Sequence, residues 1–406
     1  MPTTLRTELL FPRKTETHEM KTYRFGIIGC GLMGREFGSA VARWCHLTGL
    51  DFRPEIVAVC DANPAMMGWF QDNFPTVGQA TTDYHELLAN PAVDCVYCAV
   101  PHNLHAEFYC AIVRAGKHLL GEKPFGIDLA ANAAINACLA EHPEVFVRCS
   151  SEFPFFPPMQ RLGRLIEERA FGRIIEVNSG FLHSSDLNPL KTINWKRMIA
   201  VNGEYGCLGD LGMHPCHMPF KAGWYPRNVR AILSDIVTER PDKSGALVPC
   251  ETWDNGTLLC EASDPATGEV FPLTIKTQRI APGETDTWYF EVKGTRGCGR
   301  WSSTNPRRIE LLSYTPGGDQ AWQQIDMGWE PAFAGITGAI FEFGFPDCIQ
   351  QMWAAFLHEL HHGQPKSRFA SCVTPAEVAY THRLFTAALR SQAQATTEPV
   401  WGRVSF

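Results

Sequence analysis

The feature that most restricts the fold of this chain is a glycine-rich turn between an apolar run and a helical pattern. The run YRFGII leads into Gly29, Gly31 and Gly34 with the spacing G-x-G-x-x-G, and REFGSAVARWCHL follows with apolar residues at helical intervals. These glycines allow a tight turn, close approach of a pyrophosphate to the backbone, and packing of helix on strand. The sequence therefore predicts an N-terminal Rossmann domain that binds a dinucleotide.

The next apolar run, EIVAVCD, ends at Asp61. A carboxylate at this position can accept hydrogen bonds from both adenosine ribose hydroxyls, and it repels a 2′-phosphate. The cofactor expected is therefore NAD rather than NADP. A further strand, VDCVYCAV, precedes Pro101, His102, Asn103 and His105, and Lys123 follows another strand. Strands that alternate with helices form a parallel sheet, which binds ligands at the carboxyl ends of its strands.

The βαβ pattern is lost from about residue 151. Segments rich in β-branched and aromatic residues follow instead: GRIIEVNSGFLHS, NVRAILSDIVTER, GTLLCEA, FPLTIKTQRI and TWYFEVKGT. We predict an α/β chain with an N-terminal extension at 1–22, a Rossmann domain at 23–150, and an α+β domain at 151–406. The second domain should hold an open, mostly antiparallel sheet and two final helices, roughly 344–362 and 374–392. Because one sheet face needs cover, we expect a homo-oligomer, either a dimer or a tetramer.

Composition excludes several classes of protein. A chain of 406 residues is long enough for two cores. The formal net charge of −7 argues against a surface for nucleic acid or anionic membranes. No apolar run reaches the ~18 residues of a membrane span, and the N-terminus lacks the apolar core of a secretory signal. The 15 cysteines suit reduced thiols in a cytoplasmic enzyme.

The segment VPHNLHAEFYCAIVRAGKHLLGEKP resembles the signature of the Gfo/Idh/MocA oxidoreductases, in which P-x-N-x-x-H precedes A-G-K-H and E-K-P. FGRIIEVN resembles the start of the second domain of that family, FEVKGTRGCGRW its V-x-G-T-x-G strand pair, and TPAEVAYTHRLFTAALRS its C-terminal helix. The resemblance implies a dehydrogenase-like enzyme that acts on sugars, cyclitols and their derivatives. The residues expected to contact NAD are Gly29, Gly31, Leu32, Met33, Gly34, Asp61, Pro101, Asn103, His105, Glu122 and Lys123.

The segment NWKRMIAVNGEYGCLGDLGMHPCHMP resembles the second signature of the family, which ends in D-x-G-x-H, and Asp210, Gly212 and His214 match it. We expect a helix around 208–220, on which Asp210 and His214 share a face. Histidine is suited to accept a hydroxyl proton during hydride transfer. The resemblance implies His214 as base, Lys123 as electrostatic stabiliser and Asp210 as orienting group. Many members carry Asp in place of His217, so the role of this catalytic candidate stays open.

The substrate-binding residues are less well determined. Lys191, Lys196 and Arg197 form a basic cluster just before the second signature, and His183 and Arg279 lie on predicted strands that could face the same cleft. Together they could bind an anionic group on a sugar. The alternative is that the cluster is a basic turn exposed to solvent. An aromatic residue in this region either stacks on a sugar ring or packs, and Tyr205 replaces a glycine frequent in the family. The candidates are His183, Lys191, Trp195, Lys196, Arg197, Tyr205 and Arg279.

Two segments contain residue types that bind metals. Asp210, His214, Cys216 and His217 fall on different faces of the predicted helix, so they do not converge on one ion. HELHH at 358–362 matches the zinc-protease pattern H-E-x-x-H. Gly363 and Pro365 end that helix at once, and no third ligand is evident in the sequence. We therefore predict no metal.

Three functions compete. The first is an NAD-dependent oxidoreductase in carbohydrate metabolism that oxidises a secondary hydroxyl of a sugar. The second is an NAD-dependent glycosidase, in which 3-hydroxyl oxidation acidifies the 2-hydrogen, the aglycone is eliminated, water adds and the ketone is reduced again. That route needs another acid or base, for which His217, His183 and Tyr205 are candidates, and it would suit an anionic glycoside such as a sulfoquinovoside. The third is a sensor without catalysis, which an intact Lys123, Asp210 and His214 disfavours.

Overall fold

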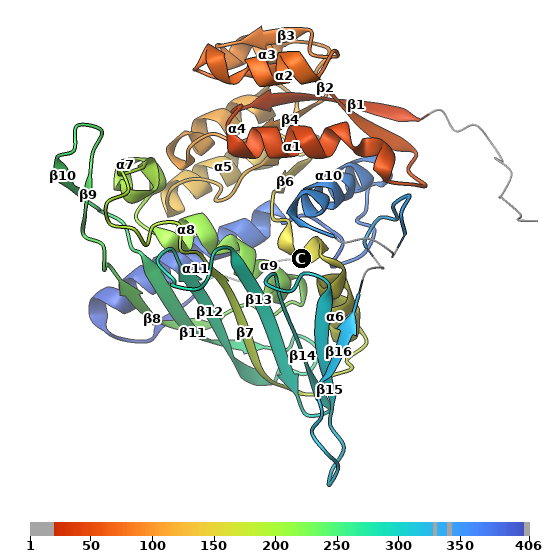
Figure 1. The fold of residues 1–406 in the computed structure, drawn as a ribbon, viewed down its shortest axis with the longest axis vertical. Helices are drawn as coiled ribbons and strands as arrows, with labels where there is room; N and C mark the ends of the chain where they lie inside the picture. Colours follow the sequence, from red (N-terminus) through yellow and green to blue (C-terminus); the bar gives the residue numbers. More distant parts are fainter. Residues whose placement is uncertain (1–19, 328–330, 339–342, 402–406) are drawn as a thin grey trace, which may run out of the picture.

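The computed structural model describes residues 20–327, 331–338 and 343–401. The predicted N-terminal extension at 1–22 lies outside these ranges except for its last three residues. In Figure 1 a parallel sheet with its helices forms the upper part of the molecule, and a larger sheet forms the lower part. Within the described part of the chain, no helix combines the length and the hydrophobicity that a membrane span requires.

The upper sheet has six parallel strands in the order β3-β2-β1-β4-β5-β6. The strands are β1 (Lys21–Ile28), β2 (Phe52–Cys60), β3 (Gln79–Thr81), β4 (Cys95–Cys98), β5 (His118–Gly121) and β6 (Val147–Cys149). The helices among them are α1 (Leu32–Ala42), α2 (Gly68–Asn73), α3 (Tyr84–Ala89), α4 (His105–Arg114) and α5 (Leu129–Glu141). Every residue of β4 is buried, because helices cover both faces of the sheet. The predicted Rossmann domain is confirmed.

Within the described residues the lower sheet has nine strands in the order β16-β15-β14-β13-β7-β12-β11-β8-β17, of which only β7 and β12 pair in parallel. Its strands are β7 (Ile174–Leu182), β8 (Asn228–Ser234), β11 (Asn255–Ser263), β12 (Val270–Gln278), β13 (Thr287–Gly294), β14 (Gly297–Ser302), β15 (Arg308–Ser313), β16 (Gln323–Asp326) and β17 (Glu398–Pro399). A small hairpin joins β9 (Glu239–Pro241) and β10 (Leu247–Pro249). The predicted open, mostly antiparallel sheet is confirmed.

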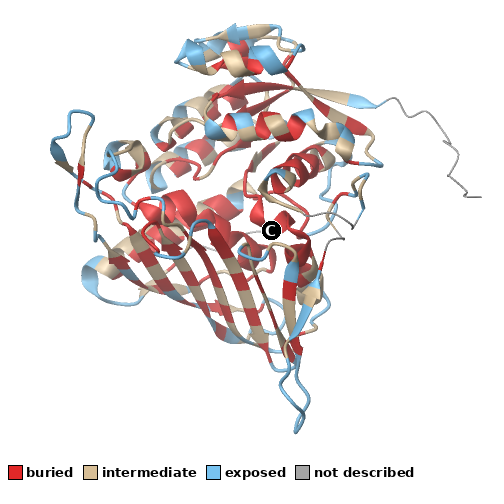
Figure 2. Cartoon of the chain, viewed as in Figure 1, coloured by how far each residue is buried: buried red, intermediate tan, exposed pale blue. Residues whose placement is uncertain are grey.

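One face of the lower sheet is covered by helices, and the other is not. The covering helices are α6 (Pro157–Glu167), α8 (Cys207–Leu211), α9 (Met213–Lys221) and α11 (Pro375–Gln394). Along the strands, buried residues alternate with partly or fully exposed ones (Figure 2). Ile232 and Leu259 stand on the uncovered face, with 65% and 54% of their surface exposed. This face therefore carries apolar side chains without cover from the described chain.

The helix α10 (Phe345–His362) returns from the second half of the chain to pack on the first. The ring of Phe356 lies 6.3 Å from that of Phe25 in β1 and 5.2 Å from that of Phe146. An ion pair of 2.8 Å joins Arg43 at the end of α1 to Asp347. The core of the N-terminal domain is thus completed by residues near the C-terminus.

Candidate active site

The turn after β1 has the geometry that a dinucleotide needs. Gly29 has φ of +94°, and a Cβ on Gly34 would lie 2.2 Å from the carbonyl oxygen of Gly29, so both positions require glycine. A Cβ on Gly31 would meet no atom within 4 Å, which leaves space above the turn. Leu32, 69% exposed, begins α1, and no described side chain caps this helix end. Its free N–H groups suit a pyrophosphate.

Asp61 lies beside this turn at the end of β2. Its Oδ2 accepts a hydrogen bond of 2.8 Å from the backbone N–H of Cys30, and its Oδ1 accepts one of 2.9 Å from Asn63. These bonds hold the carboxylate next to the predicted pyrophosphate position, where an adenosine ribose would follow. The residues present therefore fit NAD. Met33 is partly buried in the first turn of α1.

The loops after β4 and β5 are joined by His105. Its Nδ1 lies 2.6 Å from the carbonyl oxygen of Pro124 and its Nε2 lies 3.0 Å from that of Val100. Burial lowers the pKa of His105 to about 4. Both ring nitrogens of His105 thus lie at main-chain oxygens of the protein, so the structure gives this residue a role in joining two loops and not the predicted contact with NAD. Pro101 is partly buried, and Asn103 is exposed.

The E-K-P loop places its two charged residues in different surroundings. The Glu122 carboxylate accepts hydrogen bonds from Tyr97 and Ser150 and is buried. The Nζ of Lys123 donates to the main-chain oxygen of Asp210 at 2.5 Å and to its Oδ1 at 3.1 Å. Glu122 therefore fixes the loop, while Lys123 reaches the second signature across 87 positions of sequence.

Asp210 is the centre of a charged cluster that includes Lys123. The Nζ of Lys196 lies 3.2 Å from its Oδ2, and Nη2 of Arg279 lies 2.9 Å from the same oxygen. The Nε2 of His102 lies 4.0 Å from Oδ1. Burial raises the pKa of the Asp210 carboxyl, but Lys123, Lys196 and Arg279 together hold it well below its ordinary value. Asp210 is therefore ionised.

The two lysines of this cluster differ in their acidity. Burial lowers the pKa of Lys123, but Asp210 and Glu122 outweigh this effect, so that its pKa is raised and the amine is charged. Burial lowers the pKa of Lys196 to about 8, although Asp210 opposes the shift. The neighbouring charges of Arg279 and Lys123 contribute to this lowering. The pKa of Lys196 is thus lower than that of Lys123, and its charged form prevails below about pH 8.

His214 lies in α9 with an environment that keeps its imidazole neutral. Burial and then the charge of Lys123 hold its pKa well below the ordinary value. Its Nδ1 lies 3.3 Å from Oγ of Ser151, and its ring meets Phe153 and Phe181 edge to face at 5.3 and 5.2 Å. When Nδ1 donates to Ser151, the lone pair of Nε2 is free to accept a proton.

The structure changes the predicted role of Asp210. Instead of one helix at 208–220, α8 and α9 meet at Gly212, where a Cβ would lie 2.5 Å from the Phe385 ring. The carboxylate oxygens of Asp210 contact cations, while the nitrogen contact of His214 is with Ser151. The side-chain contacts of Asp210 are therefore with Lys123 and Lys196 rather than with His214.

Three predicted site residues lie in the core. The ring of His217 is fully buried beside the backbone of Ser151 and Ser371. The hydroxyl of Tyr205 lies 2.7 Å from Oγ1 of Thr386, and its side chain has no exposed surface. Nη1 of the fully buried Arg197 lies 2.7 Å from a carboxylate oxygen of Asp254. None of these three side chains has surface that a substrate could reach. The structure therefore places His217, Tyr205 and Arg197 outside the site, contrary to the prediction.

Other predicted substrate residues border the charged cluster. The Trp195 ring lies 4.9 Å from that of His102, which itself approaches Asp210. His183 pairs with Asp286 at 3.5 Å and keeps 24% of its side chain exposed. Lys191 binds Asp186 at 2.9 Å, so its charge is already compensated.

Three neighbours of the cluster were absent from the predicted site residues: His102, Ser151 and Glu152. Burial, together with Glu122, raises the pKa of the Glu152 carboxyl to about 8, although Lys123 opposes the shift. Ser151 and Glu152 come just after β6, as Lys123 comes just after β5. The carboxyl-end rule for parallel strands therefore also indicates this pair.

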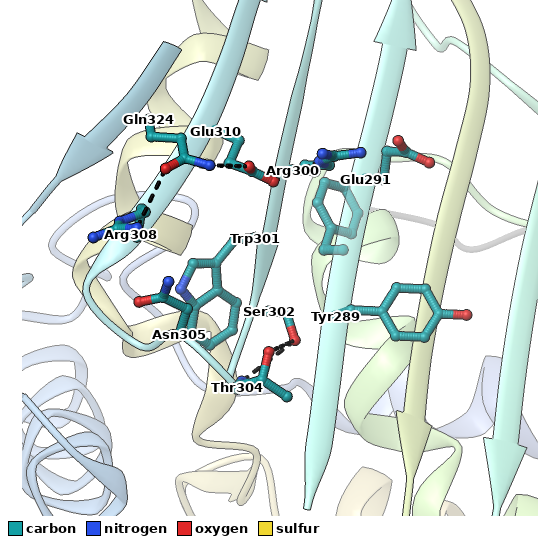
Figure 3. A pocket seen from close by; sticks show the side chains of 11 residues that line it. Tyr289, Glu291, Arg300, Trp301, Ser302, Thr304, Asn305, Arg308, Glu310 and Gln324 are labelled. Atoms are coloured by element: carbon teal, nitrogen blue, oxygen red, sulfur yellow. Dashed lines mark hydrogen bonds and ion pairs between the residues drawn. The ribbon is translucent and has the colours of Figure 1, made fainter. Parts of the chain in front are cut away.

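A separate hollow of about 370 Å³ lies among β13, β14, β15 and β16 (Figure 3). Tyr289, Glu291, Arg300, Glu310 and Gln324 line it, together with neighbouring residues of the same strands. None of the predicted catalytic residues is among those that line it. It is a feature of the large sheet and not of the charged cluster.

In comparisons with known proteins, this chain is similar to NAD-binding oxidoreductases. Residues 23–148 match the GFO_IDH_MocA family, described as an oxidoreductase family with an NAD-binding Rossmann fold. Levoglucosan dehydrogenase of Pseudarthrobacter phenanthrenivorans is 26% identical over 68% of this chain and 73% of its own length. Glucose-6-phosphate 3-dehydrogenase of Bacillus subtilis is 27% identical over 71% of this chain and 77% of its own.

Solved structures share the fold of nearly the whole chain. A levoglucosan dehydrogenase in complex with NADH and L-sorbose superposes with a TM-score of 0.83 and 21% identity, covering 95% of this chain and 100% of that one. An inositol dehydrogenase homologue of Azotobacter vinelandii gives 0.73 and 18%, covering 93% and 97%. The N-terminal domain, residues 23–148, thus matches the NAD-binding Rossmann fold of the GFO_IDH_MocA oxidoreductase family, and nearly the whole chain shares the fold of these solved structures.

Proposed function

We propose that this protein is an NAD-dependent dehydrogenase that oxidises a secondary hydroxyl of a sugar or sugar derivative. The observation that carries the proposal is the contact of Lys123 with Asp210 beside a neutral His214. The names of the relatives, levoglucosan dehydrogenase and glucose-6-phosphate 3-dehydrogenase, support a carbohydrate as substrate.

The proposed division of labour follows from the charges. NAD, held by the turn at 29–34 and by Asp61, supplies the hydride acceptor. His214 accepts the hydroxyl proton at Nε2, because its neutral form prevails at neutral pH. The ammonium of Lys123 stabilises the developing alkoxide. Asp210 keeps Lys123 charged and in place, and Trp195 and His183 contact the sugar.

The test is the formation of NADH with a panel of sugars that includes levoglucosan, glucose 6-phosphate and inositol. We expect NADH absorbance to rise with at least one of them, and Lys123→Met and His214→Ala each to abolish the rise. If both variants retained wild-type rates on a confirmed substrate, the assignment of the site would be wrong.

The glycosidase remains a second candidate because of Glu152. Its carboxyl, with a pKa of about 8 and near Lys123, is a further acid at neutral pH, as that route requires. We propose Glu152 for this acid role in place of His217 and Tyr205, whose side chains lie in the core. The two reactions differ in their products: a glycosidase releases aglycone without net NADH, and a dehydrogenase forms NADH without releasing aglycone.

We further propose that the uncovered face of the large sheet joins two copies of this chain. Ile232 and Leu259 expose 65% and 54% of their surface on this face, although a helix cover would bury them. Light scattering after gel filtration should give at least twice the mass of one chain, and Leu259→Glu should lower it. A wild-type protein with the mass of one chain would exclude this proposal.

A further inference from the structure

A cluster of two histidines and an aspartate lies outside the candidate active site, where the last turn of α10 meets the start of β2. The Nε2 of His361 lies 3.5 Å from Oδ2 of Asp51, and the Nε2 of His362 lies 3.3 Å from Oδ1. One ligand atom from each of the three residues can be chosen such that all lie within 4.8 Å of one another. Asp51 therefore adds a third side chain of a metal-binding type, which the sequence pattern did not reveal.

The separations fit coordination better than direct hydrogen bonding. A charge-assisted N–H···O bond is about 2.7–2.9 Å long. Zinc binds imidazole nitrogen at ~2.0–2.1 Å and carboxylate oxygen at ~2.0–2.2 Å, so two ligand atoms on a tetrahedron around it are about 3.3–3.5 Å apart. The pair of His361 with Oδ2 of Asp51, at 3.5 Å, and the pair of His362 with Oδ1, at 3.3 Å, each have this spacing, so each imidazole faces its own oxygen of the carboxylate.

The surroundings hold the first imidazole in the orientation that a ligand needs. The hydroxyl of Tyr23 lies 3.1 Å from Nδ1 of His361. Histidines that bind metals are usually held through their other ring nitrogen, which leaves the ligating nitrogen with its lone pair. The buried ring of Phe52 lies 5.8 Å from the ring of His361 and 6.4 Å from that of His362, so both pack on one apolar side chain.

This site differs from the one that the H-E-x-x-H pattern suggests. In a zinc protease Glu359 would serve as base, but here it pairs with Arg148 of β6 and is buried. The imidazoles that approach Asp51 are instead those of the consecutive His361 and His362, and the helix ends just after them at Gly363, with its φ of +72°. A protease-like site is therefore excluded on the geometry of Glu359.

We propose that Asp51, His361 and His362 bind a divalent first-row transition ion such as Zn²⁺. The ligand set of two imidazoles and one carboxylate suits Zn²⁺, Co²⁺ and Ni²⁺ rather than Mg²⁺ or Ca²⁺, which prefer oxygen. Partly exposed side chains leave the remaining positions to water. The ion links the end of α10 to β2 and thus ties the returning helix to the N-terminal domain.

The experiment uses the full chain with Cys45→Ser, since Cys45 is an exposed thiol that would itself bind Zn²⁺. Zn²⁺ is titrated by calorimetry into this parent and into Asp51→Asn, His361→Ala, His362→Ala and Tyr23→Phe. We expect the parent to bind one equivalent of Zn²⁺. In Asp51→Asn, His361→Ala and His362→Ala this binding should be lost or its affinity should fall at least about tenfold, and in Tyr23→Phe the affinity should fall about tenfold. Mg²⁺ should give no corresponding binding.

His142→Ala is the matched control. His142 also lies beside a carboxylate, with its Nδ1 3.2 Å from Glu144, but it does not belong to the cluster of Asp51, His361 and His362. It should bind Zn²⁺ as the parent does. Co²⁺ should give the visible absorption of a low-coordinate complex in the parent and lose it in His361→Ala. Equal Zn²⁺ affinity of the parent, Asp51→Asn and His361→Ala would overturn the proposal, as would a parent without any saturable binding.

Discussion

The Nζ of Lys196 lies 3.2 Å from Oδ2 of Asp210, on the opposite carboxylate oxygen from Lys123. One buried aspartate thus holds two ammonium groups whose pKa values are shifted in opposite directions. Lys123 stays charged over the physiological range, and Lys196 changes charge near pH 8. We therefore expect an activity that depends on this cluster to be sensitive to mildly alkaline pH.

A pH profile tests the contribution of Lys196. Its charged form, which prevails below about pH 8, adds to the potential that favours an alkoxide, so kcat/KM should decline as the pH rises through this value. Lys196→Arg should remove the decline, because guanidinium stays charged. Lys196→Met should lower kcat/KM about tenfold below pH 8. The exposed Lys243→Met is the control, and a Lys196→Arg profile identical to the wild type would contradict the assignment.

Replacement of His214 tests the proposed base. Loss of a general base typically costs about 10²–10⁴ in rate, and we expect this loss in kcat for His214→Ala. Because burial and Lys123 depress the pKa of His214, its basic form persists below pH 6.5. The wild-type rate should therefore show no acid limb near that pH. An acid limb at the ordinary histidine value that disappears in His214→Ala would show that the imidazole is solvated.

Asp61 should govern the choice of cofactor. Asp61→Asn keeps an oxygen for the N–H of Cys30 and removes the charge that repels a 2′-phosphate. Like charges near a protein surface repel by about 1–4 kcal/mol, so the preference for NAD over NADP should fall at least about tenfold. KM for both cofactors, measured with one sugar at saturation, gives the ratio. An unchanged ratio would place the ribose elsewhere.

Arg197 should be a stability residue rather than a substrate residue. Its guanidinium pairs with Asp254 at 2.7 Å, and neither side chain is exposed. Removal of one partner leaves a buried charge unpaired, so Arg197→Met should lower the free energy of unfolding by about 3–5 kcal/mol. Asp254→Asn in the same chain should restore part of it. Urea unfolding measures both, and KM of the folded fraction should not change.

The local parts of the site followed from the sequence. Gly29 and Gly34 are required by backbone geometry, and Asp61 by its place at a strand end, so neighbouring residues sufficed to predict them. The predicted roles of Lys123 and His214 depended on the resemblance of two sequence motifs to those of a known family. Each of these predictions depended on short stretches of chain whose conformation has few alternatives.

The partners of these residues did not follow from the sequence. Lys196 and Arg279 meet Asp210 across 14 and 69 positions, and only tertiary packing decides which cation reaches a given carboxylate. Arg197 is next to Lys196 in sequence, yet its side chain enters the core towards Asp254. Asp51 and His361 are 310 positions apart, so HELHH alone lacked its third ligand.

The return of α10 to the N-terminal domain has a consequence for biosynthesis. Phe356 contacts Phe25 and Phe146, and Asp347 pairs with Arg43, so residues 345–362 supply part of the interior of the domain that is translated first. While a ribosome is still adding the large sheet, that interior lacks one wall. We therefore expect the nascent NAD-binding domain to complete its core only after residues 345–362 have emerged. A chimera that exchanges only residues 23–148 between relatives would pair this helix with a domain from another protein.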